Sequence, residues 1–142
     1  AHAHPLHGKA FSTLGQKLAP LTQDACAFYE CHDVFTEYHG VVLDTSEGDA
    51  IADMLEDNKA LILQNHGLLT VGETIDAATW WYVTLERSCQ AQLLAQAAGK
   101  PKPIAHQAAI SAQQSVGSAL AGWFSCLPLY TVIMREQPEL FE

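Results

Sequence analysis

The stretch Ala60-Leu-Ile-Leu-Gln-Asn-His-Gly-Leu-Leu-Thr-Val71 combines two short apolar runs with a polar break between them. Apolar runs of this length, bounded by turn residues, are typical of buried strands. Asn and Gly are residues that readily occupy the tight turn between two such strands. The stretch therefore predicts two buried strands joined by a turn or kinked hairpin, with His66 at the bend.

Helical spacing of apolar residues predicts helices on both sides of this hairpin. The expected helices cover residues 5–14, 23–32, 51–55 with a cap at Ser46, 73–98, and 106–127 with a break near Pro128. A β-branched run over residues 40–43 predicts one more strand. Helices alternating with short strands indicate an α/β arrangement in which the helices pack on the sheet.

The length of the chain, 142 residues, fits a single domain over 1–142. Its first residue is Ala1, inside a histidine cluster, and we expect that an N-terminal part of this domain precedes it. Hydrophobic residues make up 49% of the chain and charged residues 16%, a composition that excludes an intrinsically disordered protein.

The charge balance argues against polyanionic partners. Seven Lys and Arg residues face 16 Asp and Glu residues, so the formal net charge is −9. A field of this sign repels nucleic acid and anionic membranes. No apolar run approaches the roughly 18–20 residues that span a bilayer, and no secretion signal opens the chain.

The cysteines are irregularly spaced and form no C-x-x-C pair; they are Cys26, Cys31, Cys89 and Cys126. This spacing fits neither a zinc finger nor a small disulfide scaffold. We expect free, mostly buried thiols in a reducing compartment, and therefore a cytoplasmic protein. A Cys26–Cys31 link or a nucleophilic cysteine remains as an alternative.

The pair His2 and His4 is the first candidate for chemistry. Residues at i and i+2 of a strand point to the same face, and Pro5 favours extended geometry at His4. Two imidazoles so placed can converge on one metal ion, and a catalytic zinc site takes three protein ligands. We take His66 as the third candidate, because Gly67 beside it leaves room for a metal or a substrate.

Other interpretations of the histidines stay open on spacing alone. His7 is a rival third ligand, and it can instead form a supporting hydrogen bond or face solvent. The pair at the start of the chain also fits two polar residues at a frayed terminus. The remaining histidines stand without partners in the sequence and are expected to be ordinary surface or core residues: His32, His39 and His106. The run Trp80-Trp-Tyr82 predicts core packing together with helix or subunit contacts.

With these residues in place, the chain resembles the class II aldolase and adducin family over about residues 1–94. The pairing of an H-x-H motif with a distant N-H-G-L-L is the specific part of this resemblance. The matching pieces are His2-Ala-His4, Lys9-Ala-Phe-Ser-Thr-Leu-Gly15, Leu18-Ala-Pro-Leu21, Tyr38-His-Gly40, Glu47-Gly48, Leu63-Gln-Asn-His-Gly-Leu-Leu69, Val71-Gly72, Ala77-Ala78 and Leu85-Glu86. The resemblance implies a three-layer α/β/α sandwich around a largely antiparallel sheet.

The resemblance also implies a metal site on His2, His4 and His66, holding Zn²⁺ or another divalent ion such as Mn²⁺, Co²⁺ or Fe²⁺. It implies a homotetramer with active sites at subunit boundaries. The implied reaction is that of an aldolase-type lyase, which cleaves a C–C bond in a small hydroxy-carbonyl or sugar-phosphate substrate through a metal-stabilised enediolate.

The chain departs from the family pattern in its acid/base chemistry. The acidic acid/base residue of the family lies before the H-x-H motif, and no later Asp or Glu matches it. Tyr130 is the only tyrosine late in the chain, but its surroundings do not match the proton-donating tyrosine of some members. The catalytic acid/base is therefore unassigned. Two alternatives remain: an adducin-like assembly module without catalysis, and a non-haem iron oxygenase on the same three histidines.

Overall fold

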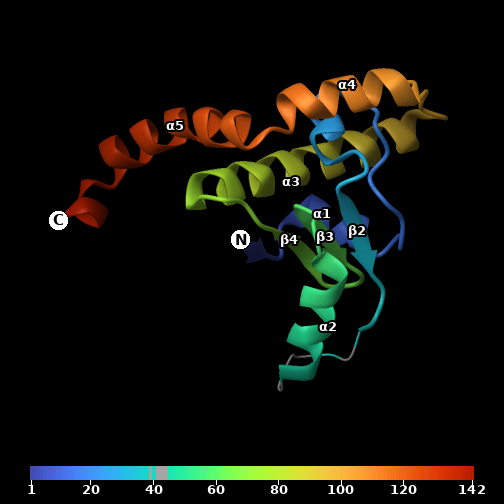
Figure 1. Cartoon of the computed structure of the whole chain (residues 1–142), viewed down its shortest axis with the longest axis horizontal. Helices are drawn as coiled ribbons and strands as arrows, with labels where there is room; N and C mark the ends of the chain where they lie inside the picture. Colours follow the sequence, from blue (N-terminus) through green and yellow to red (C-terminus); the bar gives the residue numbers. More distant parts are fainter. Residues whose placement is uncertain (39, 41–44) are drawn as a thin grey trace.

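The computed structural model describes residues 1–38, 40 and 45–142 (Figure 1). The strands are β1 (His2–Ala3), β2 (His32–Phe35), β3 (Ala60–Leu63) and β4 (Gly67–Thr70). The helices are α1 (Leu6–Ser12), α2 (Thr45–Leu55), α3 (Ile75–Ala98), α4 (His106–Val116) and α5 (Ala119–Glu136), with 3₁₀ turns η1 (Ala25–Phe28) and η2 (Pro138–Phe141).

The four strands form one sheet in the order β1-β4-β3-β2. Strand β4 runs antiparallel to both β1 and β3, whereas β2 runs parallel to β3. The expected hairpin is β3–β4, in which Leu63 pairs with Gly67. Asn65 in its turn has a φ of +59°, a left-handed conformation that Asn tolerates better than most residues. The prediction from residues 60–71 is confirmed.

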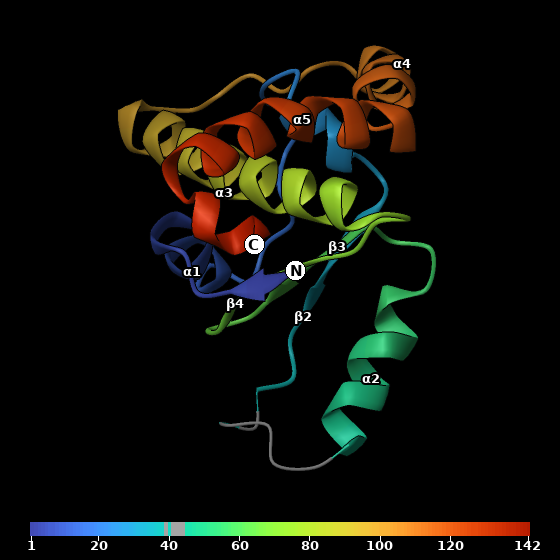
Figure 2. The same cartoon turned by 90° about the vertical axis from the view of Figure 1, so that its left-hand side faces the viewer.

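Helices cover both faces of the sheet, so the fold has three layers (Figure 2). Side chains of β3 alternate between two cores, as the period of a strand requires. Ile62 packs into the larger core with α1 and α3, and Leu61 packs into a smaller core with Ile51 of α2. Helix α5 packs along α3 outside these layers. The expected α/β/α sandwich with a largely antiparallel sheet is confirmed.

Helix α3 begins and ends close to the expected residues. The Thr74 hydroxyl accepts a hydrogen bond from the Ala77 N–H at 3.1 Å and caps the helix, and Gly99 follows its last residue. On this helix Ile75 is 79% exposed, whereas Trp81 is buried.

Trp81 packs in the core and between helices, as its sequence context predicts. Its ring meets the ring of Phe28 edge-on at 6.2 Å between centroids. Gly122 of α5 lies against the same indole, since a Cβ there would approach Trp81 to 2.6 Å. The contact explains why a glycine occupies this position of α5.

The expected helix over residues 23–32 is wrong beyond its first turn. Only η1 forms, and the chain turns at Glu30, whose φ is +56°. His32 then enters β2, a strand that the sequence pattern did not predict. Its Nδ1–H donates to the Phe28 carbonyl at 2.6 Å, and its Nε2 accepts from the Leu18 N–H at 2.9 Å. The expected strand over 40–43 falls on residues 41–43, which lie outside the described residues.

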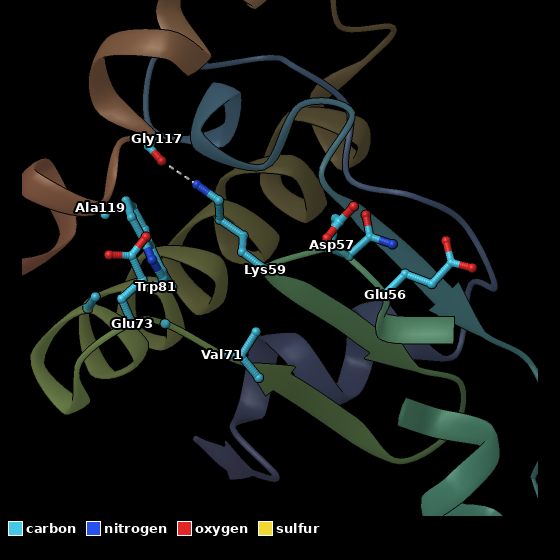
Figure 3. Close-up of a pocket in the computed structure, with 11 residues that line it drawn as sticks. Glu56, Asp57, Lys59, Val71, Glu73, Trp81, Gly117 and Ala119 are labelled. Atoms are coloured by element: carbon cyan, nitrogen blue, oxygen red, sulfur yellow. Dashed lines mark hydrogen bonds between the residues drawn. The ribbon is translucent and has the colours of Figure 1, made fainter. Parts of the chain in front are cut away.

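The expected single helix over residues 106–127 is also wrong, because it divides at Gly117 and Ser118. The Ser118 hydroxyl caps α5 by accepting from the Ala121 N–H at 3.2 Å. The Lys59 ammonium, reaching up from the start of β3, donates to the Gly117 carbonyl (Figure 3). The helix continues through Pro128, where a break was expected. The expected cap at Ser46 is wrong as well, since α2 already begins at Thr45.

All four cysteines are free in the structure, and Cys26, Cys89 and Cys126 are buried, as expected. Within the described ranges, no single helix has both the length and the apolar character to cross a membrane. Taken together, helices α4 and α5 have the length and apolar composition of a membrane span, but they are bent by 59° relative to each other.

We predict that His32 makes the fold sensitive to acid. Burial lowers the pKa of its imidazole, and both ring nitrogens are already bound in the neutral form. The unfolded chain takes up a proton at this residue near pH 6.5, whereas the folded chain does so only at lower pH. Stability should therefore fall as the pH drops below about 6.5, by at most about 1.4 kcal/mol per pH unit for this residue.

Denaturant titrations at pH 7.5, 6.5 and 5.5 measure this loss. The variant His32→Gln should be less stable at pH 7.5 and should show a shallower fall towards pH 5.5. The matched control is His106→Gln, which removes a histidine whose side chain is 64% exposed instead of a buried one. The same slope in His32→Gln as in the natural protein would contradict the prediction.

Candidate metal centre

Three histidines converge at one end of the sheet. His2 lies in β1, His4 follows that strand directly, and His66 lies in the turn between β3 and β4. One ring nitrogen from each lies within 4.8 Å of the other two. The ring centroids are 4.6–5.2 Å apart. Because β1 pairs with β4, the turn that precedes β4 is carried beside the H-x-H segment.

The hydrogen bond of His2 fixes which of its nitrogens is free. Nδ1 lies 2.8 Å from the Leu68 carbonyl oxygen, which can only accept, so Nδ1 carries the proton. Nε2 of the neutral ring then has a lone pair available for a ligand. A ring N–H bound to a carbonyl is the usual support for a metal-binding histidine.

The surroundings of His66 favour the neutral form of its ring. Burial and the neighbouring rings of His2 and His4 lower its pKa, while Glu47 opposes this shift. Across the described part of the chain, the rings of His4 and His66 contact other imidazoles but form no hydrogen bond. Their lone pairs are thus uncommitted, and the donor set suits a borderline divalent ion such as Zn²⁺ or Fe²⁺.

Gly67 allows β1 to approach the β3–β4 turn. A Cβ at this position would lie 2.6 Å from the Ala3 carbonyl oxygen and 3.1 Å from Cδ2 of the His4 ring. The space that the missing side chain leaves is therefore filled by the H-x-H segment itself. The expectation that Gly67 leaves room for a metal or a substrate is wrong, because Ala3 and His4 occupy that space.

The other histidines lie elsewhere. His7, the rival third ligand, directs Nδ1 to the Glu86 carboxylate at 2.8 Å instead of joining the cluster. His32 is buried in the core, and His106 Nδ1 lies 2.9 Å from the Tyr29 hydroxyl at the surface. His39 lies outside the described residues.

A cavity of about 510 Å³ opens at the three histidines. Its other described lining residues are Lys9, Tyr38, Gly40 and Asn65. Sequence reasoning did not select Lys9, Tyr38 or Asn65 as site residues. Asn65 is the neighbour of His66 in the sequence, so the N-H-G motif could have indicated it as a site residue. Lys9 and Tyr38 are distant from His66 in the sequence, and only the fold brings them to the cavity. Tyr130 does not line this cavity, so the catalytic acid/base stays unassigned.

A second cavity, of about 420 Å³, lies near the α4–α5 corner (Figure 3). Acidic residues Glu56, Asp57 and Glu73 lie among its lining residues. Lys59 also lines it, but its ammonium binds the Gly117 carbonyl and lies 4.2 Å from the centroid of the Trp81 ring. These contacts give Lys59 a structural role, and the chemistry of the molecule concentrates at the histidines instead.

Comparison with known proteins identifies relatives over the region that carries the histidine cluster. Residues 1–93 match the family described as Class II Aldolase and Adducin N-terminal domain. The 4-hydroxy-3-prenylphenylpyruvate oxygenase/4-hydroxy-3-prenylbenzoate synthase of Streptomyces roseochromogenus subsp. oscitans is 49% identical over 98% of this chain and 50% of its own length. The decarboxylase NovR of Streptomyces niveus is 48% identical over 98% of this chain and 52% of its own.

A solved structure agrees with these matches. L-fuculose 1-phosphate aldolase from Glaciozyma antarctica superposes with a TM-score of 0.88 and 45% identity, covering 97% of this chain and 52% of that one. The chain thus spans about half the length of the relatives it matches.

Proposed function

This chain belongs to the class II aldolase and adducin family, and we propose that it forms the metal-binding part of an enzyme that cleaves a carbon–carbon bond beside a carbonyl group. The observation that carries the proposal is the convergence of His2, His4 and His66, whose ring nitrogens lie within 4.8 Å of one another. A protein with only a scaffolding role has no need of three uncommitted imidazoles at the mouth of a cavity.

His2, His4 and His66 would hold Zn²⁺ or another divalent ion such as Mn²⁺, Co²⁺ or Fe²⁺. Three neutral imidazoles leave the full charge on the ion, which would act as a Lewis acid on oxygens of the substrate. The fit of the site rests on the tautomer that Leu68 imposes on His2 and on the lowered pKa of His66.

The remaining lining residues suit a small substrate that carries an anionic group. The Lys9 side chain is unpaired within the described chain, although the protein has a net charge of −9. Its ammonium can therefore bind a carboxylate or a phosphate, and the Asn65 amide can bind a hydroxyl or carbonyl oxygen. No described lining residue carries a carboxylate, and we assign no general acid or base.

Within this reaction class we propose an aldolase-type lyase, acting on a small hydroxy-carbonyl or sugar-phosphate substrate. The similarity to a fuculose 1-phosphate aldolase supports this choice. A second candidate, a non-haem iron oxygenase that uses the same three histidines, is favoured by the 49% identity to an oxygenase of a prenylated arylpyruvate. Both act on a substrate with a carbonyl group and an anionic group.

The test uses the full-length protein, purified without chelators and analysed for metal by mass spectrometry. Aldehyde release from sugar phosphates and oxygen uptake with aryl 2-oxo acids are then measured with Zn²⁺ and with Fe²⁺. Metal-dependent aldehyde release supports the lyase, and Fe²⁺-dependent oxygen uptake supports the oxygenase. A protein that binds no metal but assembles normally would overturn both in favour of an adducin-like module.

We also propose a cytoplasmic homo-oligomer, a tetramer. Support comes from exposed apolar side chains on α5, among them Leu120 and Phe124, which are 71% and 65% exposed. Light scattering on the full-length protein tests the state, and a monomer would contradict it.

A further inference from the structure

Glu86 extends from the middle of α3 to the first turn of α1. One carboxylate oxygen, Oε1, accepts from the backbone N–H of His7 at 2.9 Å and from Nδ1–H of the same residue at 2.8 Å. The other oxygen, Oε2, accepts from the backbone N–H of Gly8 at 2.5 Å. One carboxylate therefore satisfies two backbone donors that the start of a helix leaves unpaired.

This contact, at His7 and Gly8, begins three residues after His4 of the cluster. Only His4 and Pro5 connect the end of β1 to the start of α1. Before them, β1 is fixed to β4 through the pairing of Ala3 with Leu68. After them, the carboxylate of Glu86 holds the chain. The position of the His4 ring thus depends on two anchors, one on the sheet and one on α3.

The first turn of α1 packs tightly against its neighbours at Gly8. A Cβ on Gly8 would lie 2.3 Å from Cδ1 of Leu68 and 3.0 Å from Oε2 of Glu86. Leu68 also provides the carbonyl that binds the His2 ring. The first turn of α1 is therefore packed between the residue that orients His2 and the carboxylate that holds His7 and Gly8.

We propose that Glu86 is a positioning residue of the histidine cluster, which fixes the first turn of α1 and thereby the place of His4 relative to His2 and His66. The importance of this role for metal binding rests on the proposed function. Ligands must be held to within about 0.5 Å for a preorganised site, and loss of an outer support typically lowers metal affinity about 10–100-fold.

Substitutions can separate the two backbone hydrogen bonds of Glu86 from its hydrogen bond to the His7 ring. The variant Glu86→Ala removes all three hydrogen bonds, whereas His7→Ala removes only the ring contact and keeps both backbone contacts. Glu86→Gln keeps an oxygen for His7 but directs an amide N–H₂ at the Gly8 N–H, where no acceptor remains. If Glu86 acts through α1, Glu86→Ala should have the largest effect and His7→Ala the smallest.

The experiment titrates Co²⁺ into the full-length protein and its variants and follows the visible absorption of the bound ion. Glu86→Ala should lower the affinity about 10–100-fold and change the shape of the spectrum, because a displaced ligand alters the coordination. Glu86→Gln should fall between this variant and the natural protein. The matched control is Gln90→Ala on the exposed side of the same helix, which should leave affinity and spectrum unchanged.

Hydrogen exchange of the metal-free protein provides a second readout that needs no metal. Glu86→Ala should speed exchange over residues 3–9 while α3 stays protected. Unchanged exchange there, or an unchanged Co²⁺ spectrum and affinity, would overturn the proposal. If the natural protein binds no Co²⁺, the proposed function fails, and the exchange experiment still decides whether Glu86 holds the cluster.

Discussion

Replacing His66 by alanine is expected to abolish stoichiometric metal binding. A three-imidazole site that loses one ligand keeps two, too few for the three protein ligands typical of a catalytic zinc site. We expect the affinity for Zn²⁺ or Co²⁺ to fall by more than about 100-fold, since even the loss of an outer support costs about 10–100-fold. Metal content after purification and dialysis measures the loss directly.

The fold should survive this substitution. His66 lies in a turn, and its ring makes no hydrogen bond within the described residues. The metal-free melting temperature should therefore stay near that of the natural protein. A metal that binds only the folded state raises the melting temperature. That rise should appear in the natural protein and vanish in His66→Ala.

The variant His7→Ala is the matched control, because His7 was the rival third ligand in the sequence. The Nδ1 atom of His7 is hydrogen-bonded to the Glu86 carboxylate and does not join the cluster, so this variant should retain metal. Loss of metal in His7→Ala together with full metal content in His66→Ala would reverse the assignment. Full metal content in both variants would exclude the three-histidine site.

The sequence predicted those parts of the fold that local patterns determine. The β3–β4 hairpin follows from two apolar runs around Asn65 and Gly67, and α3 follows from a cap at Thr74 and a long helical stripe. The convergence of His2 and His4 follows from their spacing. The choice of His66 as the third ligand came from its place at the bend beside Gly67 and was strengthened by the family resemblance.

Features that depend on contacts between distant segments could not be predicted from the sequence. Strand β2 was not predicted, and its first residue, His32, was expected at the end of a helix, because the partners of His32 at Leu18 and Phe28 belong to the tertiary fold. At the division between α4 and α5, the Gly117 carbonyl accepts a hydrogen bond from Lys59, which lies 58 residues away in the chain. The contact between Glu86 and His7 spans 79 residues, and no periodicity along the chain indicates it.

Replacing Gly67 by alanine is expected to damage the site, because the added methyl group would meet the backbone of β1. The added Cβ would lie 2.6 Å from the Ala3 carbonyl oxygen, a backbone atom that cannot rotate away. Strand β1 must then shift from β4, to which it is joined by the pairing of Ala3 with Leu68 and by the hydrogen bond from the Thr70 N–H to the Ala1 carbonyl at 2.9 Å. Overpacking of this kind typically destabilises a protein by about 1–3 kcal/mol.

The shift of β1 carries His2 and His4 with it, so metal affinity should fall together with stability. Urea unfolding and Co²⁺ titration of the same preparations measure the two effects. The matched control is Gly48→Ala in α2, where a Cβ would meet nothing within 4 Å. In a helix this control should raise stability by up to about 1 kcal/mol and leave Co²⁺ binding unchanged. If Gly67→Ala bound Co²⁺ as tightly as the natural protein, the close approach of β1 to the turn would not be what brings the three imidazoles together.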